Sequence, residues 1–305
     1  MKKIVCILLC VCLLTSCLML CASAENAQTN AEQPVFLLMG DSIPDAYGIE
    51  NRDEACYGRI VADTDHFVYR NIGRTAMDST ELIDFINLYA IWDHEKNGWH
   101  NVRDYIAEAD ILCLSIGGND FFDREDTAKL LAGALFGVNK KALDTIAAQY
   151  YENLCTLMDL IVSINPDVVI LVQTLYCAWY GLAENANRAC SKRVNGMIEK
   201  YDREHPGRIH ICDVSSAMRW KPQNLADDCV HPNASGNVAI AEAVLRTLYD
   251  LGLGTATTPV VNVPGEDWNY FTTYYEKPKG LFLAAIVMIA TGNGVNVFRL
   301  LKEAR

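Results

Sequence analysis

From residue 33 to residue 251 the sequence alternates between two patterns of hydrophobic and polar positions. Short apolar runs rich in β-branched residues recur between Gly, Asn and Asp, as strands buried in a parallel sheet do. They cover residues 35–39, 67–72, 111–116, 168–173 and 209–214. Between and after them, apolar residues follow helical spacing over residues 79–89, 102–109, 141–164, 184–201 and 234–251. The pattern therefore predicts alternating strands and helices throughout.

This alternation predicts an α/β fold of three layers (α/β/α), in which one five-stranded parallel sheet has helices on both faces. In such a sheet the working site lies at the carboxyl ends of the strands. The predicted strands lead into loops that begin at Gly40, Gly73, Gly117, Thr174 and Ser215. We expect the domain to span residues 33–253, because the last helix ends at Leu251-Gly252.

The first 24 residues follow another pattern. Lys2 and Lys3 precede an apolar run over residues 4–20, and an Ala-Ser-Ala site ends at Ala24, which is typical of a secretory signal peptide. An uncleaved membrane helix and a lipoprotein acylated at Cys17 are the alternatives. The apolar run continues past Cys17 and the chain turns polar after Ala24, which favours cleavage there. The mature protein is therefore predicted to be secreted or displayed at the cell surface.

Removal of residues 1–24 changes the composition. The full sequence has 38 acidic and 26 basic side chains, a formal charge of −12 and 12 cysteines. The signal contains Lys2, Lys3 and five cysteines, so the mature chain has a charge of −14 and seven cysteines. Seven cysteines cannot all pair, and two lie in predicted core strands, which argues against a disulfide scaffold. The acidity argues against nucleic acid as a partner.

The composition changes again after the predicted domain. Residues 254–280 are predicted to be a linker with an aromatic cluster, which comprises Trp268, Tyr270, Phe271, Tyr274 and Tyr275. Residues 281–305 form an apolar segment with basic residues at its end. Such flanks are typical of a membrane anchor, but the apolar run is short and two Asn interrupt it. Membrane association and packing on the domain both stay open.

Two loops contain the residues of a nucleophilic serine site. Ser42 follows the first predicted strand and a Gly turn, which would expose its hydroxyl at the edge of the sheet. Asp228 and His231 follow the last strand, three positions apart. A carboxylate can then contact one imidazole nitrogen and leave the other free to take a proton from a hydroxyl. A packed loop histidine is the alternative for His231, and Asp227 is the less favoured carboxylate.

Two middle loops offer donors for an oxyanion. Asn119 follows the third predicted strand, and residues 71–78 form the loop after the second. A tetrahedral oxyanion needs preorganised donors, and an Asn amide with backbone N–H groups at strand ends can provide them.

Together these loops resemble the SGNH (GDSL-type) hydrolase family over residues 35–251. The shared motifs are Gly40-Asp41-Ser42, Gly117-Gly118-Asn119-Asp120 and Asp228-Cys229-Val230-His231. The resemblance implies a flavodoxin-like fold, Ser42 as nucleophile, His231 as general base and then acid, and Asp228 as the group that orients His231. It also implies an oxyanion hole from the Ser42 N–H, the N–H of the second loop and the Asn119 side chain.

One position departs from the family's pattern. Five residues after Asn71, where the family usually has a Gly whose N–H faces the oxyanion, this chain has Ala76. We expect Ala76 to offer its N–H only if its backbone avoids the positive φ that Gly tolerates. The alternative is that Gly73 supplies the N–H from a shifted loop.

The loops at this edge also predict a substrate pocket, because such loops shape specificity. Asp41 and Gly118 adjoin the nucleophile and the oxyanion donors. Phe121 and Phe122, together with Trp92, are candidates to line an acyl or sugar pocket.

The sequence therefore predicts an exported serine ester hydrolase without a cofactor or metal, since no cysteine pair has zinc-ribbon spacing and no phosphate loop is present. Its partner would be a small-molecule or polysaccharide ester. The sequence shows no long apolar lid near the site, which favours short acyl groups such as acetyl. A lipase-like acylhydrolase and a catalytically inactive glycan-binding module are the alternatives, and the oligomeric state is not predicted.

Overall fold

The computed structural model describes residues 33–49, 52–94, 96–122, 130, 133–134, 137–178, 184–219, 221–226 and 228–261. The predicted signal peptide, most of the predicted linker, the apolar segment 281–305 and Asp227 lie outside the described residues. Predictions about them stay predictions.

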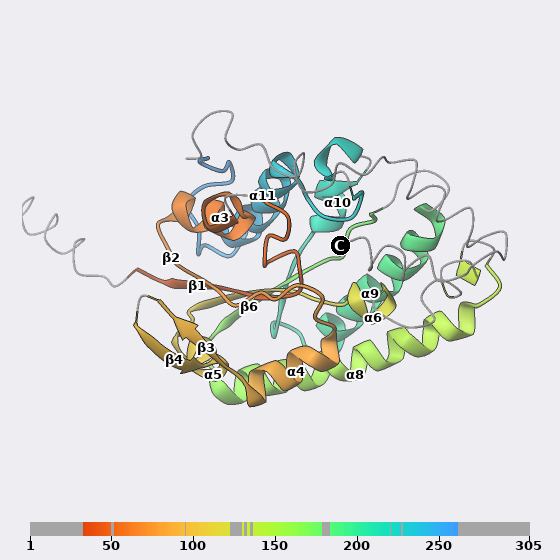
Figure 1. Ribbon diagram of the computed structural model, residues 1–305, viewed down its shortest axis with the longest axis horizontal. Helices are drawn as coiled ribbons and strands as arrows, with labels where there is room; N and C mark the ends of the chain where they lie inside the picture. The colour runs from red at the N-terminus through yellow and green to blue at the C-terminus, as the bar shows by residue number, and fades with distance from the viewer. Residues whose placement is uncertain are drawn as a thin grey trace, which may run out of the picture. The chain divides into compact units, whose positions relative to one another are not determined.

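Five parallel strands form the central sheet, which confirms the predicted fold class (Figure 1). In chain order they are β1 (Val35–Gly40), β2 (Val68–Asn71), β5 (Ile111–Ser115), β6 (Val169–Gln173) and β7 (His210–Cys212). Their spatial order is β2-β1-β5-β6-β7, the order of a flavodoxin-like doubly wound sheet. The chain reverses its direction of winding after β2, so the carboxyl ends of β1 and β5 lie side by side at the switch point.

Helices cover both faces of the sheet, as Figure 1 shows. One face is covered by α3 (Tyr57–Asp65), α10 (Val214–Met218) and α11 (Ala234–Asp250). The other is covered by α4 (Ser79–Leu88), α5 (Val102–Glu108), α8 (Lys140–Ile164) and α9 (Glu184–Glu204). Shorter helical segments include α2 (Arg52–Ala55), α6 (Asn119–Phe122) and the 3₁₀ turn η2 (Pro222–Asn224).

The sequence pattern located the longer elements to within a few residues but missed others. Neither α2 nor α3 was predicted, and the segment after α4 forms an antiparallel hairpin, β3 (Ala90–Asp93) with β4 (Gly98–Asn101). Trp92 lies opposite Trp99 in this hairpin, and their rings meet edge to face.

The core lies between the sheet and its helices. Residues 36–39 of β1 are fully buried, because helices pack on both faces of this central strand. Gly58 lets α3 lie directly on β1, since a Cβ at this position would lie 2.2 Å from Leu38 Cδ1.

Two helices begin immediately after loops of the predicted site. Asp78 caps α4 by accepting from the Glu81 N–H at 2.8 Å, while the Glu81 carboxylate accepts from the Asp78 N–H at 3.1 Å. This reciprocal pair is a capping box. Asn233 caps α11 by accepting from the Gly236 N–H at 3.0 Å. These caps fix where the loops that precede them end, and so restrict the backbone near the site.

The chain beyond α11 folds back onto α3. Asp65 Oδ1 accepts from the Thr255 N–H and hydroxyl, both at 2.8 Å, and from the Ala256 N–H at 3.3 Å. The Val260 N–H donates to Thr64 Oγ1 at 2.9 Å. The first residues of the predicted linker, 254–261, are therefore held against the domain.

Within the described residues, Cys56, Cys113, Cys155, Cys177, Cys190 and Cys212 have free thiols. Among the same residues, no helix is both long enough and apolar enough to span a bilayer.

We expect Asp65→Ala to release residues 254–261 from α3. The change removes the acceptor of three hydrogen bonds, so the free energy of unfolding should fall by about 1–3 kcal/mol. The amides of Thr255 and Ala256 should exchange with solvent much faster in hydrogen-exchange mass spectrometry. Asp63→Ala, in a surface ion pair of the same helix, is the control. Unchanged exchange at these amides would contradict the contact.

Candidate active site

Ser42 lies at the carboxyl end of β1, where β1 and β5 approach closely. Gly40 has a φ of 134°, and a Cβ there would lie 1.9 Å from the Ser115 carbonyl oxygen, so only Gly fits. The Asp41 N–H donates to that same oxygen at 3.1 Å. The Asp41 carboxylate accepts from the Ile43 N–H at 3.0 Å and so forms a tight turn around Ser42.

The loop before α11 brings His231 and Asp228 to Ser42. His231 Nε2 lies 2.9 Å from Ser42 Oγ, and Nδ1 lies 2.5 Å from Asp228 Oδ2. Asp228 Oδ1 accepts from the N–H groups of Val230 at 2.9 Å and His231 at 3.0 Å, which holds the carboxylate in place. The structure thus joins the three residues that the sequence singled out, although 189 positions separate Ser42 from His231.

Hydrogen bonds determine the charge of Asp228. Burial acts to raise the pKa of its carboxyl, but the contact with His231 and the two backbone N–H groups outweigh burial and lower that pKa below its ordinary value. Asp228 is therefore a carboxylate at neutral pH, as a group that orients an imidazole should be.

Asp41 differs from Asp228 although both are close to His231. It is 3% exposed, and burial raises the pKa of its carboxyl to about 7; the Ile43 N–H and the charge of His231 oppose this rise. The environments of these two carboxyl groups thus move their pKa values in opposite directions, a pattern that occurs at functional sites.

The predicted oxyanion donors lie in the loops after β2 and β5. The Asn119 amide donates to the Met77 carbonyl at 2.9 Å, which orients the side chain next to Ala76. Ala76 has a φ of 71°, so its backbone does not avoid positive φ and the condition stated for it is not met; it adopts instead the left-handed conformation that a Gly at this position would enter freely. The left-handed conformation costs an Ala on the order of 1–2 kcal/mol, which the surrounding contacts must offset.

The alternative donor, Gly73, has another partner. Its N–H donates to Asn71 Oδ1 at 2.8 Å. A Cβ on Gly73 would lie 2.6 Å from the Asp45 nitrogen, so this glycine is required for close packing against the nucleophile loop.

The residues predicted to line a pocket have different surroundings in the structure. Gly118 lies beside the site, since a Cβ there would lie 3.9 Å from Asp41 Oδ2. Phe121 is 0% exposed and belongs to the core, and Phe122 packs partly buried against that core. Trp92 lies in the hairpin beyond the far end of α4, a helix about 15 Å long that begins near the site. Phe121 therefore lies in the core and Trp92 in the hairpin, and neither is placed to line a pocket at Ser42.

Two contacts of the site had no signal in the sequence. The Tyr47 ring packs against the His231 ring with centroids 4.8 Å apart. Asp120 accepts from the Ser79 N–H at 3.1 Å and from the Ser79 hydroxyl at 2.5 Å, which joins the start of α4 to the loop that carries Asn119. These partners are far apart in the chain, so only folding reveals them.

Among the described residues, no cluster of three His, Cys, Asp or Glu side chains could hold a metal ion.

A doubly wound sheet with Ser, His and Asp in contact at its carboxyl edge is the arrangement of a hydrolase. The model of the GDSL-like lipase/acylhydrolase family matches residues 38–239, and the chain belongs to this family. No curated protein matches the chain.

Solved structures with a similar fold include lipases. One is the lipase Lip_vut3 from a goat rumen metagenome, with 16% identity, a TM-score of 0.53 and coverage of 71% of this chain and 98% of that one. Another is phospholipase A1 from Streptomyces albidoflavus NA297, with 13% identity, a TM-score of 0.50 and coverage of 72% and 99%. An acetylxylan esterase from Geobacillus stearothermophilus has 18% identity, a TM-score of 0.49 and coverage of 75% and 97%. At these identities the likeness to the two lipases, with TM-scores of 0.50 or more, shows the fold alone.

Asp41 should make stability depend on pH. Because its pKa is raised to about 7 from 3.8, the folded protein keeps a proton that the unfolded chain has lost between these values. This contribution to stability is fully present below about pH 4 and is lost as the pH rises through about 7. Asp41→Asn still offers an oxygen to the Ile43 N–H but cannot ionise. Relative to wild type, the variant should gain free energy of unfolding between pH 4 and pH 8, measured by urea denaturation. A constant difference would refute the raised pKa.

Proposed function

We propose that the protein is a carboxylic ester hydrolase that transfers an acyl group through Ser42 to water. The observation that carries this proposal is the continuous contact from Asp228 through His231 to Ser42, at 2.5 and 2.9 Å. Membership in a family of lipases and acylhydrolases supports it independently.

In the first half-reaction, Ser42 Oγ attacks the ester carbonyl while His231 Nε2 takes the hydroxyl proton. As the tetrahedral intermediate collapses, the bond between the acyl carbon and the alkoxy oxygen breaks, and His231 gives its proton to that oxygen so that the alcohol leaves and the acyl group stays on Ser42. In the second half-reaction, His231 takes a proton from water, which attacks the acyl-enzyme. Collapse then releases the carboxylic acid and restores the Ser42 hydroxyl.

The ionised Asp228 has two roles in this scheme. By accepting from Nδ1–H it selects the imidazole tautomer whose Nε2 can receive the Ser42 proton. Its charge also stabilises the imidazolium that forms during each half-reaction. The lowered pKa of the Asp228 carboxyl supports both roles, because the carboxylate persists at the pH where His231 works.

Stabilisation of the oxyanion is assigned to the backbone N–H groups of Ser42 and Ala76 and to the Asn119 side chain. The bond from Asn119 to the Met77 carbonyl uses one of the two amide hydrogens and leaves the other for the substrate. The same bond fixes the amide before the substrate arrives, which is what preorganised stabilisation requires.

For the substrate we propose short-chain or acetyl esters, including those of carbohydrates. The burial of Phe121 supports short acyl groups, because this candidate for lining an acyl pocket lies in the core and is not exposed to a longer acyl chain. The predicted signal peptide supports esters that are encountered outside the cytoplasm, such as acetylated polysaccharide.

Replacement of the nucleophile should abolish turnover. We expect Ser42→Ala to lower kcat on p-nitrophenyl acetate on the order of 10⁴-fold or more, because no acyl-enzyme can form. Asn119→Ala should lower kcat by about 10²–10³-fold through loss of one oxyanion donor.

Ser163→Ala and Asn87→Ala, at exposed helical positions, are matched controls that should retain activity. Wild-type activity in Ser42→Ala would refute the mechanism.

The acyl preference is tested with p-nitrophenyl esters from acetate to palmitate. We expect kcat/KM to be highest for acetate or butyrate and to fall by at least about tenfold by octanoate. An acyl chain too long for the site would be misplaced or left unburied, which weakens binding of the transition state. Release of acetate from acetylated xylan, measured by chromatography, would extend the result to carbohydrates. A maximum at long chains would identify a lipase-like acylhydrolase instead.

A further inference from the structure

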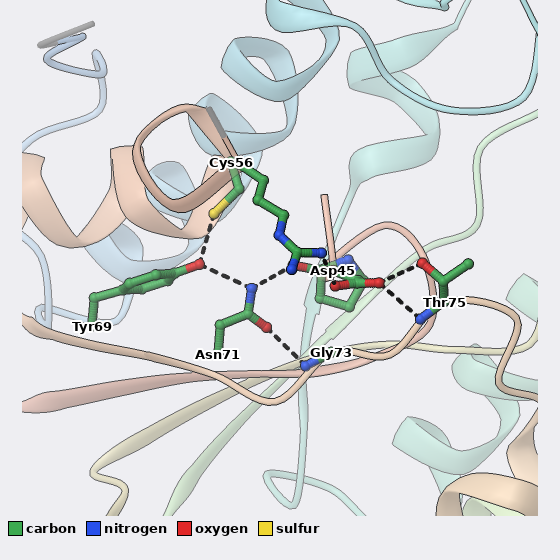
Figure 2. A network of polar contacts seen from close by, with 8 residues as sticks. Asp45, Cys56, Tyr69, Asn71, Gly73 and Thr75 are labelled. Atoms are coloured by element: carbon green, nitrogen blue, oxygen red, sulfur yellow. Dashed lines mark hydrogen bonds and ion pairs between the residues drawn. The ribbon is translucent and has the colours of Figure 1, made fainter. Parts of the chain in front are cut away.

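The nucleophile loop and the loop that carries Ala76 are joined by a group of polar contacts, shown in Figure 2. We call these contacts the loop clamp; they involve Asp45, Asn71, Gly73 and Thr75. The first of these residues lies three positions after Ser42, and the last immediately precedes Ala76. The clamp therefore connects the proposed nucleophile with a proposed oxyanion donor.

Asp45 forms the centre of the clamp. Its Oδ2 accepts from the Thr75 N–H at 3.0 Å and also from the Thr75 hydroxyl. Its Oδ1 pairs with Arg52 at 3.3 Å, which leaves Oδ2 aimed at Thr75. One carboxylate oxygen thus holds both the backbone and the side chain of a single residue.

Asn71 forms the second half of the clamp. Its amide donates to the Pro44 carbonyl at 2.7 Å and to the Tyr69 hydroxyl at 3.0 Å, while its oxygen accepts from the Gly73 N–H. The Tyr69 hydroxyl in turn lies 2.7 Å from the sulfur of buried Cys56. Both ends of the loop from Asn71 to Thr75 are therefore tied to the nucleophile loop, as Figure 2 shows.

Ala76 makes these ties necessary. Its N–H belongs to the peptide that joins it to Thr75, so the contacts that hold Thr75 also restrict the orientation of this N–H. With a φ of 71° Ala76 is in a conformation that Ala enters at a cost and Gly enters freely. A loop with Ala here needs an external restraint that a loop with Gly would not need.

We propose that Asp45 is a positioning residue that, through Thr75, holds the Ala76 N–H in the oxyanion hole. The inference rests on the proposed ester hydrolysis. It assigns to Asp45 an effect on kcat. If the Ala76 N–H were displaced, the lost hydrogen bond would be the one to the oxyanion, which forms mainly in the transition state.

The test begins with Asp45→Ala, Asp45→Asn and the matched control Asp63→Ala, assayed on p-nitrophenyl acetate with active-site titration. Asp63 is a suitable control because it also pairs with an Arg, at 2.9 Å, but on the surface of α3. Asp45→Ala should lower kcat by about 10–10²-fold with KM changed less than about twofold. Asp45→Asn keeps an oxygen for Thr75 and should recover most of the loss.

The decisive arm repeats Asp45→Ala in an Ala76→Gly background. Because Gly adopts positive φ without the cost, the loop should keep its conformation without the clamp, and Asp45→Ala should there lower kcat by less than about threefold. A residue that only stabilises the fold would cost the same in both backgrounds. Thr75→Val, which removes the hydroxyl but keeps the shape, should lower kcat by about 5–20-fold and serves as the test if Asp45→Ala does not fold.

The outcomes separate the two proposals. An inactive Ser42→Ala together with a wild-type kcat in Asp45→Ala, or an equal loss in both backgrounds, would overturn the role of Asp45 and leave the ester hydrolase standing. If Asp45→Ala does not fold, a wild-type kcat in Thr75→Val overturns it instead. Full activity of Ser42→Ala would overturn both.

Discussion

The close approach of β1 and β5 at the carboxyl edge of the sheet is the constraint on which the site depends. At Gly40 the backbone has a φ of 134°, and the space where a side chain would begin is occupied by the Ser115 carbonyl. The chain therefore turns sharply and presents Ser42 at the edge, while the Asp41 N–H bonds to the same carbonyl. Because β5 continues into Asn119, this one contact sets the nucleophile beside the loop with the amide donor.

Around this point the fold supplies each remaining group from a different element. The loop before α11 delivers His231 and Asp228, and the loop before α4 delivers Ala76. Helix caps, the Asp120–Ser79 bonds and the loop clamp fix these loops. Such rigidity is what electrostatic stabilisation of a transition state requires, because donors that need no reorganisation lose no energy when charge develops.

The sequence predicted the sheet, the position of Ser42 and the pairing of Asp228 with His231, because each depends on a local pattern: a buried β-branched run, a glycine turn, or a three-residue spacing. The contact between Ser42 and His231 spans 189 positions, and its prediction depended on the shared edge of the sheet and on the family resemblance. It missed α3, where Gly58 and several polar residues obscure the helical periodicity. It could not show the Asp45–Thr75 contact across 30 positions, nor that Phe121 turns into the core. The conformation of Ala76 was missed for the same reason, since only the assembled loops impose it.

Reaction with a fluorophosphonate tests the central claim, an activated Ser42, most directly. The probe phosphonylates serines whose hydroxyl is deprotonated by a neighbouring base, and the modified peptide is identified by mass spectrometry. The account predicts one adduct per chain, on the peptide that contains Ser42, and at least about tenfold slower labelling in His231→Ala because the base is lost. Absence of labelling at Ser42 in the folded wild-type protein, or labelling that is unchanged in His231→Ala, would contradict it.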